Sequence, residues 1–245
     1  MIALALGFCV LLLLGVWFHP LFQKTSPALP VLLWQQSDAR KGIPLKSFEK
    51  LLAALQRKHF STILPGDILS ASLPKQPVLL VLANGYQSYM QILPLLEKYN
   101  ARIALALPVG LVGQYDAWNV KGPWQNLLTA EQIKTLHATK RIAFISQTLD
   151  NLSLDTLDVQ QSAWQLAESK TRLKNLYHLP VQTILYPCQT PHGPAVLNAA
   201  QKLYTLQIGR QCGNNPWPLA AGPLRVFEVT NHTCLIRLMW KMRRP

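Results

Sequence analysis

Hydrophobic and polar positions follow two different periods along most of this chain. Short uninterrupted apolar runs, typical of buried strands, are separated by longer segments whose apolar residues recur at helical spacing. In the segment 46–59, for example, Phe48, Leu51 and Leu55 fall on one helical face. The predicted strands are 31–34, 78–82, 103–107, 142–145, 183–186, 205–208 and 224–229, and the predicted helices are 46–59, 92–99, 129–139, 157–177 and 194–203.

Strands and helices alternate in this order, which predicts parallel strands joined by helical crossovers. About seven such units in about 220 residues suit a barrel better than an open sheet, given the length of eight-unit barrels. We therefore predict an α/β fold, with a (β/α) barrel that occupies residues 31–245. The sequence contains no evident internal repeat.

The first residues of the chain differ from the rest. Residues 1–22 contain no Asp, Glu, Lys or Arg, and residues 2–18 are apolar apart from Gly7 and Gly15. As a helix, residues 2–22 would be about 31 Å long, enough to cross the apolar core of a bilayer. The segment is therefore a candidate transmembrane helix.

A cleaved signal peptide is the alternative interpretation of this segment. Such a peptide needs basic residues before the apolar run and small residues at its exit. No Lys or Arg precedes the run, and Trp17 and Phe18 at the exit are bulky. We therefore predict an uncleaved single-pass membrane anchor at 1–22, a Pro-containing linker at 23–30 and a globular domain at 31–245.

The chain is strongly basic, with 24 Lys and Arg against 11 Asp and Glu, a formal net charge of +13. This charge favours anionic partners such as lipid headgroups, acidic glycans or nucleic acid, although it also serves solubility. The basic residues are scattered, except in the tail that holds Arg237, Lys241, Arg243 and Arg244. No helix-turn-helix, zinc-finger or RNA-binding pattern accompanies that tail, so nucleic acid is not expected as a partner.

The side of the membrane on which the domain lies has two interpretations. Lys24, Arg40 and Lys41 follow the predicted span and no basic residue precedes it, so the positive-inside rule favours the cytoplasm. Large domains, however, translocate largely regardless of charge. We expect an extracytoplasmic, periplasmic domain, with the cytoplasmic side left open.

Eight short segments follow one another at or beside the predicted elements. They read Val-Leu-Leu-Trp-Gln (31–35), His-Phe-Ser-Thr-Ile (59–63), Val-Leu-Ala-Asn-Gly-Tyr (81–86), Leu-Pro-Leu-Leu-Glu-Lys-Tyr (93–99), Arg-Ile-Ala-Leu-Ala-Leu (102–107), Leu-Thr-Ala-Glu-Gln-Ile (128–133), Ser-Gln-Thr-Leu-Asp-Asn-Leu (146–152) and Leu-Tyr-Pro-Cys-Gln (185–189). In order and spacing they resemble the polysaccharide deacetylases of carbohydrate esterase family 4, over nearly everything after residue 30. The resemblance implies a distorted (β/α) barrel with its site at the carboxyl ends of the strands, where barrel sites lie.

The resemblance also implies which positions would carry catalysis. In the family, the first Asp of a TFDDGY segment acts as a base. The second Asp and the two His of SHTxxHxxL hold a divalent metal that polarises the acetyl carbonyl and activates water. The matching positions here are Ala83 for the base and Asn84, Gln147 and Asn151 for the metal ligands.

Other site positions depart from the family as well. Trp34-Gln35 stands where the family has Tyr-His, and Gln189 stands where it has the Gly of its YPxG loop. Neutral carboxamides lack the anionic charge or imidazole nitrogen of zinc-type ligands, and Ala83 has no proton acceptor. We therefore expect no intact catalytic residue, no metal and no other cofactor.

Two further arrangements are open at the same end of the predicted barrel. His192 with Cys188 and Cys212 could form a relocated metal site, but their spacing matches no standard pattern, and a surface His is the simpler interpretation. Cys188 and Cys212 each follow one of two consecutive predicted strands. They are candidates for a disulfide at the rim of the barrel, with two free thiols as the alternative.

Polar and aromatic residues near the degenerate site are candidates for binding a ligand. Carboxamides both donate and accept hydrogen bonds, and aromatic rings stack on sugars or simply pack in the core. The candidates are Trp34, Gln35, Asn84, Tyr86, Gln147, Asn151 and Tyr186, with Trp118, Trp124 and Trp217 in predicted loops.

Three functions fit these observations. The first is a catalytically silent, membrane-tethered accessory protein of cell-envelope or exopolysaccharide handling, which binds a glycan or a partner enzyme. The second is an active carbohydrate deacetylase or other hydrolase with a rebuilt site. The third is a structural subunit of a membrane protein complex that uses the barrel as a scaffold. A fold does not by itself choose among them.

Overall fold

A computed structural model describes residues 28–34, 43–70, 73–120, 122–191 and 193–243. The predicted anchor at 1–22, most of the predicted linker, Gln35 and His192 lie outside the described residues. Among the helices that the structure describes, none is long and apolar enough to cross a membrane.

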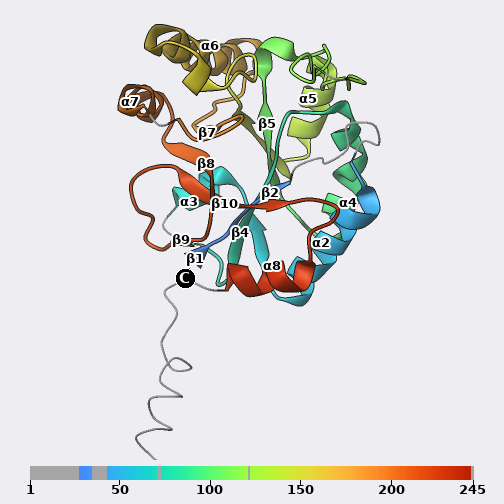
Figure 1. The fold of residues 1–245 in the computed structure, drawn as a ribbon. Helices are drawn as coiled ribbons and strands as arrows, with labels where there is room; N and C mark the ends of the chain where they lie inside the picture. Colours follow the sequence, from blue (N-terminus) through green and yellow to red (C-terminus); the bar gives the residue numbers. More distant parts are fainter. Residues whose placement is uncertain (1–27, 35–42, 71–72, 121, 192, 244–245) are drawn as a thin grey trace, which may run out of the picture.

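Seven parallel strands close into a barrel (Figure 1). They lie in the order β2-β10-β8-β7-β6-β5-β4, and β2 pairs with β4 to close the ring. The strands are β2 (Val31–Trp34), β4 (Pro77–Leu82), β5 (Ile103–Leu107), β6 (Ile142–Ser146), β7 (Thr183–Leu185), β8 (Leu206–Cys212) and β10 (Leu224–Val229). This confirms the predicted parallel barrel, and the short strand β3 (Ser61–Ile63) is added beside β4.

Helices between the strands cover the outside of the barrel (Figure 1). Those at predicted positions are α2 (Leu45–Arg57), α4 (Leu93–Lys98), α5 (Ala130–Ala138), α6 (Val159–Tyr177) and α7 (Pro194–Leu203). Residue 92, predicted as helix, ends the 3-10 helix η2 (Gln87–Ile92), and a further 3-10 turn, η4 (Leu154–Thr156), precedes α6. The sequence pattern did not reveal the short helix α3 (Pro65–Ile68) or the C-terminal helix α8 (Leu235–Met242).

Local hydrogen bonds fix where two of the long helices begin. The Thr129 hydroxyl accepts from the Gln132 backbone N–H, and the Gln132 side chain accepts from the Thr129 N–H. Asp158 and Gln161 make the same reciprocal pair at the start of α6. These capping boxes satisfy backbone donors that the first helical turn leaves free.

The apolar side chains form two layers separated by the sheet. Alternate residues of a strand point to opposite faces, so Val31 and Leu33 of β2 join the inner cluster while Leu32 and Trp34 join the outer one. The inner cluster includes the small residues Ala104 and Ala106. The outer cluster packs between the strands and the helices, where the Trp34 ring meets Phe48 edge to face at a centroid distance of 5.3 Å.

The first described residues belong to the folded domain. Strand β1 (Ala28–Leu29), which the sequence assigned to the linker, pairs antiparallel with β9 (Asn215–Pro216). The Asn215 side chain donates to the carbonyls of Leu29 and Arg225, at 2.9 and 3.0 Å, and accepts from the Arg225 N–H at 2.8 Å. One buried carboxamide therefore ties β1 to the segment that begins β10.

We predict that Asn215→Ala lowers the free energy of unfolding by roughly 2–3 kcal/mol, because it leaves buried backbone groups of Leu29 and Arg225 without partners. Urea unfolding of the full chain, followed by tryptophan fluorescence, measures the change. The control is Asn198→Ala at an exposed position of α7, which we expect to stay within about 0.5 kcal/mol of the wild type. Equal stabilities of the two variants would contradict this role of Asn215.

Candidate functional site

The loops after β4 and β6 bring three carboxamide side chains together. Gln147 Nε2 donates to Asn84 Oδ1 at 2.6 Å and to Asn151 Oδ1 at 2.8 Å. Gln147 Oε1 accepts the backbone N–H of Asn84 at 2.7 Å. Carboxyl ends of parallel strands meet at one end of a barrel, so residues 63 positions apart in sequence become neighbours. We call Asn84, Gln147 and Asn151 the carboxamide cluster.

Unusual backbone conformations aim these side chains at one another. Asn84 and Asn151 have φ angles of 74° and 60°, in the left-handed region that Asn tolerates better than most residues. Gly85 follows with φ of 61°, and a Cβ at this position would lie 2.7 Å from Leu107 Cδ2. The turn after β4 therefore requires a glycine, and it places Asn84 against Gln147.

A tyrosine and a carboxylate extend the carboxamide cluster on one side. Asn84 Nδ2 donates to the Tyr86 hydroxyl at 3.2 Å, and that hydroxyl donates to Asp116 Oδ2 at 3.4 Å. The other Asp116 oxygen accepts the Gln125 N–H at 2.6 Å, and the carboxylate is 1% exposed. Burial, followed by the nearby Asp116 charge, raises the pKa of Tyr86 to about 12, so its hydroxyl is a proton donor at neutral pH.

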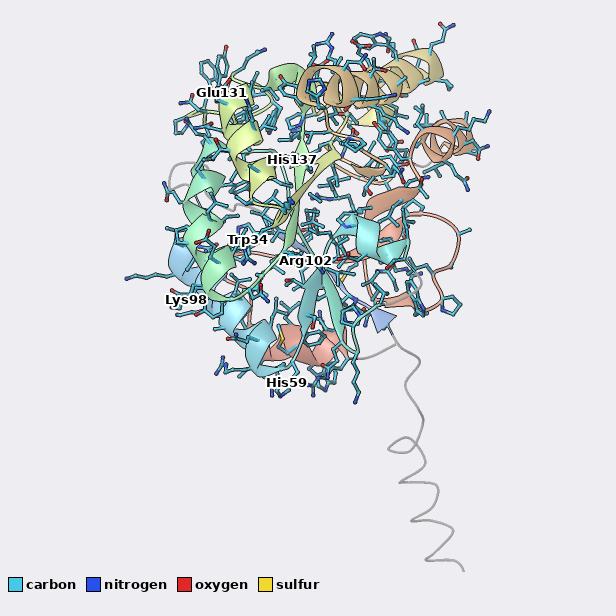
Figure 2. All side chains as sticks on the ribbon, turned by 180° about the vertical axis from the view of Figure 1, so that it is seen from behind. Trp34, His59, Lys98, Arg102, Glu131 and His137 are labelled. Atoms are coloured by element: carbon cyan, nitrogen blue, oxygen red, sulfur yellow. The ribbon has the colours of Figure 1, made fainter. Side chains whose placement is uncertain are left out.

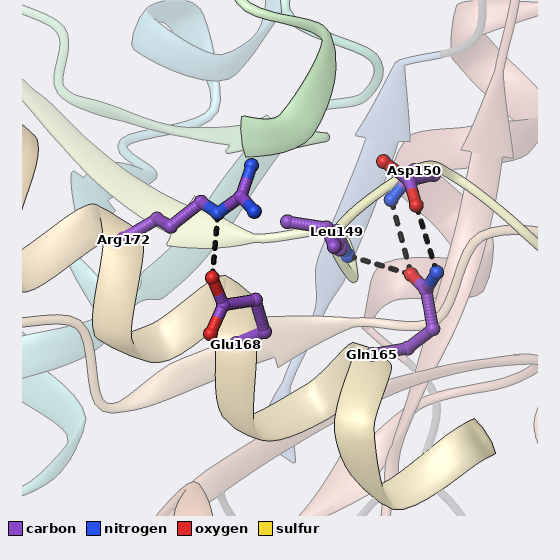
Figure 3. A network of polar contacts seen from close by, with 5 residues as sticks. All are labelled: Leu149, Asp150, Gln165, Glu168 and Arg172. Carbon is purple, nitrogen blue, oxygen red and sulfur yellow. Dashed lines mark hydrogen bonds and ion pairs between the residues drawn. The ribbon is translucent and has the colours of Figure 1, made fainter.

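Gln165 of α6 holds Leu149 and Asp150, in the loop that carries Gln147 and Asn151 (Figure 3). Its Oε1 accepts the backbone N–H groups of Leu149 and Asp150, both at 3.1 Å, and its Nε2 donates to Asp150 Oδ2 at 2.8 Å. One turn further along α6, Arg172 and Glu168 pair at 2.7 Å. The loop 147–151 is thus fastened to a long helix, and sequence reasoning did not identify Gln165.

Ala83, which the resemblance in sequence places at the position of a base, is buried and apolar. Ala83 is 5% exposed, and its carbonyl accepts from the Tyr89 hydroxyl at 3.0 Å. Burial raises the pKa of Tyr89 above its usual value, so this phenol also stays protonated. Ala83 thus offers only a methyl group and a backbone carbonyl.

Two predicted ligand-binding residues lie in the core. Trp34 is 1% exposed and packs on Phe48, and its indole N–H finds no hydrogen-bond partner among the described residues. Tyr186 is fully buried and donates to Gln207 Oε1 at 2.5 Å. Both side chains therefore pack in the core, which is the alternative that the sequence left open.

The loop between β5 and α5 supplies the exposed aromatic surface beside the site. Its backbone pairs with the turn after β4, since the Leu128 N–H donates to the Gly85 carbonyl at 2.9 Å. Within the loop, Trp124 is 59% exposed and stacks on Tyr115, with ring centroids 4.8 Å apart and planes 24° from parallel. Trp118 instead leans on Tyr86, at a centroid distance of 6.5 Å. Sequence reasoning named Trp124 and Trp118 but missed Tyr115.

Of the remaining candidates that the structure describes, none is hydrogen-bonded to the carboxamide cluster. Trp217 packs, partly buried, against the inner apolar cluster. Cys188 and Cys212 are free, exposed thiols, so the disulfide considered between them is not formed in the structure. Gln189 donates to Asp155 Oδ2 at 2.7 Å.

The donor set at the carboxamide cluster does not fit a divalent metal of the zinc type. Metal sites of the zinc type need anionic or imidazole ligands, whereas all three groups here are neutral amides. The Gln147 amino group also lies between the two Asn oxygens and donates to both. Among the residues that the structure describes, no group of three or more His, Cys, Asp or Glu is placed to hold a metal ion.

Comparisons with known proteins agree on the fold. No family model matches the chain. A Bacillus subtilis protein named "Putative polysaccharide deacetylase YxkH" is 28% identical over 201 residues, which cover 79% of this chain and 66% of that protein. The match thus spans slightly less than two thirds of the relative's length.

Two solved structures have the same architecture. The Streptococcus pyogenes deacetylase PplD, in complex with acetate, superposes with a TM-score of 0.73 and 18% identity, over 89% of this chain and 99% of that one. IcaB from Ammonifex degensii superposes with a TM-score of 0.71 and 20% identity, over 84% of this chain and 93% of that one. The chain therefore has the barrel fold of the polysaccharide deacetylases.

The raised pKa of Tyr86 predicts a loss of stability at alkaline pH. Between the usual tyrosine pKa of 10 and the folded value of about 12, the unfolded chain releases this proton while the folded chain keeps it. The free energy of unfolding therefore falls as pH rises through this window. We expect a smaller fall in Tyr86→Phe than in the wild type, measured by urea unfolding of the full chain at pH 9 and pH 11.

The variant Asp116→Asn provides the graded comparison. It removes the charge that adds to the effect of burial but leaves burial in place, so its fall should lie between those of the wild type and Tyr86→Phe. An identical fall in all three proteins would show that Tyr86 ionises equally in both states.

Proposed function

We propose that this chain is a catalytically silent relative of the polysaccharide deacetylases that binds a glycan as an accessory protein of cell-envelope or exopolysaccharide handling. We further propose that residues 1–22 anchor it in a membrane, with the domain outside the cytoplasm. The carboxamide cluster is the observation that supports the proposed loss of catalysis. The positions that match the family's metal ligands hold Asn84, Gln147 and Asn151, hydrogen-bonded to one another.

Metal-assisted deacetylation needs a Lewis acid and a base, and neither has a suitable residue at these positions. A metal bound there would face neutral amides and would have to displace the Gln147 amino group from both Asn oxygens. The methyl group of Ala83 cannot take a proton from water. Asp116 is the nearest connected carboxylate, but it already accepts from Tyr86 and from the Gln125 backbone.

The same groups suit a ligand that is neutral and rich in hydroxyl groups. A carboxamide offers two donors and an acceptor with two lone pairs, so Asn84 and Asn151 retain hydrogen-bonding capacity beyond the bonds to Gln147. Asn84 is partly exposed and can present that capacity to solvent. The exposed Tyr115–Trp124 stack, on a loop joined to the turn after β4, offers a flat apolar surface for a sugar ring.

The names of the relatives suggest the class of glycan. The Bacillus subtilis relative is named for polysaccharide deacetylation, and the Streptococcus pyogenes structure is of a deacetylase with acetate. We propose an N-acetylated polysaccharide as the ligand of this chain, bound rather than hydrolysed.

We predict that the purified full chain holds far less than one equivalent of zinc, cobalt or nickel and releases no acetate from acetylated chitooligosaccharides. Elemental analysis and an acetate assay measure both. About one metal ion per chain that is lost in Gln147→Ala, together with acetate release, would instead establish a rebuilt catalytic site.

Restoring the family residues tests whether the barrel itself is intact. We expect the variant Ala83→Asp, Asn84→Asp, Gln147→His, Asn151→His to bind about one zinc ion per chain, because it recreates an Asp and two His with an open position. Ala83→Asp alone is the matched control. It adds the carboxylate at position 83 but not the three metal ligands, and it should bind no zinc. If the folded fourfold variant also binds none, the backbone no longer holds these positions in metal-binding geometry.

Glycan binding is the direct test of the proposed function. We predict that the full chain binds chitooligosaccharides, and that Gln147→Ala and Trp124→Ala each raise the Kd by about tenfold, equivalent to about 1.4 kcal/mol. Isothermal titration calorimetry measures the Kd. The control Trp164→Ala removes an indole that is 54% exposed on α6 and should leave the Kd unchanged.

Two outcomes would contradict glycan binding at this site. Equal losses in all three variants would indicate that binding does not depend on this site, and no binding by the folded wild type would favour the scaffold function. Each can be read independently of the metal and acetate assays.

A further inference from the structure

The C-terminal helix α8 is strongly amphipathic and lies on the outside of the barrel. Its inner side is apolar and buried, with Leu238, Met239 and Met242 in the outer core cluster. Its outer side carries two large apolar residues in the open, since Ile236 is 85% exposed and Trp240 is 53% exposed. They are four positions apart, so they form one stripe along the helix.

Cations border this apolar stripe on both sides. On one side, Arg57 and Lys58, at the end of α2, and Arg243 of α8 line a hollow of about 650 Å³ together with Ile236 and Trp240. On the other side, α8 carries the exposed basic side chains of Arg237 and Lys241, which line a second hollow. We call these five basic residues, with Ile236 and Trp240, the α8 surface.

Acidic residues are missing from the segments that build the α8 surface. No Asp or Glu occurs in 50–66 or in 229–245. Glu49, which precedes the first segment, pairs with Lys98 at 2.7 Å. Glu228, which precedes the second, pairs with Arg210 at 3.0 Å and lines a hollow with Arg237 and Lys241. The five cations therefore have no acid within their own segments and share Glu228 with Arg210.

The α8 surface lies on the same side of the molecule as the first described residues. Asn214 Nδ2 donates to the Met242 carbonyl at 2.9 Å, and the next residue, Asn215, pairs with Leu29 of β1. Figures 1 and 2 show α8 and β1 at one edge of the molecule and helices α5 and α6 at the opposite edge. In Figure 2, His59, which follows Lys58, lies beside α8 at that edge. The chain before β1 contains the uncharged apolar run 2–18.

We propose that the α8 surface docks the domain on an anionic lipid surface, with Ile236 and Trp240 in the headgroup region and the five cations on lipid phosphates. Amphipathic helices with large apolar residues on one face and Lys and Arg on the other lie in the membrane interface in this way, and Trp is enriched there. Cations near an anionic leaflet strengthen such binding in proportion to their number.

Charge favours lipid over segment 1–22 as the partner of the α8 surface. The apolar segment 1–22 has no acidic residue, so docking of that segment would leave the five cations without a counterpart. An anionic headgroup layer satisfies both the apolar stripe and its cationic borders. The inference rests on the proposed membrane location but uses no residue of the carboxamide cluster.

A fluorescent probe on α8 tests the docking in the full chain. In a chain whose cysteines are replaced by serine, Ile236→Cys is labelled with an environment-sensitive dye, and the protein is reconstituted in lipid nanodiscs. We expect a blue shift of the emission in discs containing phosphatidylglycerol, smaller or absent in pure phosphatidylcholine discs and reversed at 1 M NaCl. The control Leu176→Cys, at a position of α6 that is 64% exposed, should show no shift.

Charge reversal tests the cationic border. Arg237→Glu with Lys241→Glu should reduce the equilibrium constant for docking by at least about 30-fold, because two basic contributions of about 1 kcal/mol each are lost and two repelled charges are added. Lys134→Glu with Lys174→Glu changes the net charge equally on α5 and α6, at exposed positions, and should leave docking unchanged.

Several results would overturn this inference. The inference would be wrong if the dye at position 236 showed no blue shift in anionic discs. It would also be wrong if the shift were equal in neutral discs and insensitive to salt. A blue shift before any lipid is added would assign the face to protein, either a partner or this chain. Alkaline extraction of vesicles tests the anchor separately. A chain that stays in the membrane fraction, while the dye at position 236 emits as it does in water, would support the anchor and contradict docking of the α8 surface.

Discussion

Closure of the parallel sheet is the constraint on which the rest of this structure depends. Strand β2 has four residues, yet it pairs with β4 on one side and β10 on the other, so the ring is left without an open edge. Closure also fixes which side chains enter the narrow interior, where small residues such as Ala104 and Ala106 lie. Once the register is set, the carboxyl ends of β4 and β6 must place Asn84 and Gln147 at the same end of the barrel.

The carboxamide cluster satisfies its own polar groups at a largely buried position. A charged side chain without a partner would be costly there. Gln147 is 1% exposed and Asn151 8% exposed, and as neutral amides they satisfy each other. Gln165, reaching from α6, holds the same loop by three further bonds. Hydrogen bonds between side chains, and from them to the backbone, thus hold this loop in place.

Charge and polarity are divided between two regions of the molecule. The carboxamide cluster is neutral, with the single buried carboxylate of Asp116 linked to it through Tyr86. The basic residues that give the chain its net charge of +13 lie elsewhere. On the α8 surface, cations surround an exposed apolar stripe. Recognition of a neutral polymer at one region and attraction to an anionic layer at the other would therefore not compete.

Local periodicity was enough to predict the barrel, because each buried strand and each amphipathic helix carries its own pattern; β5 and α7 lie where the sequence placed them. The resemblance in sequence also predicted that Asn84, Gln147 and Asn151 stand at the positions of the family's metal ligands, and this stays a prediction. Only the tertiary structure decided that these amides bond to one another, that Gln165 holds the loop 147–151, and that Trp34 is buried in the core. Such facts depend on strand register and side-chain direction between residues far apart in sequence, and no local pattern encodes those distances.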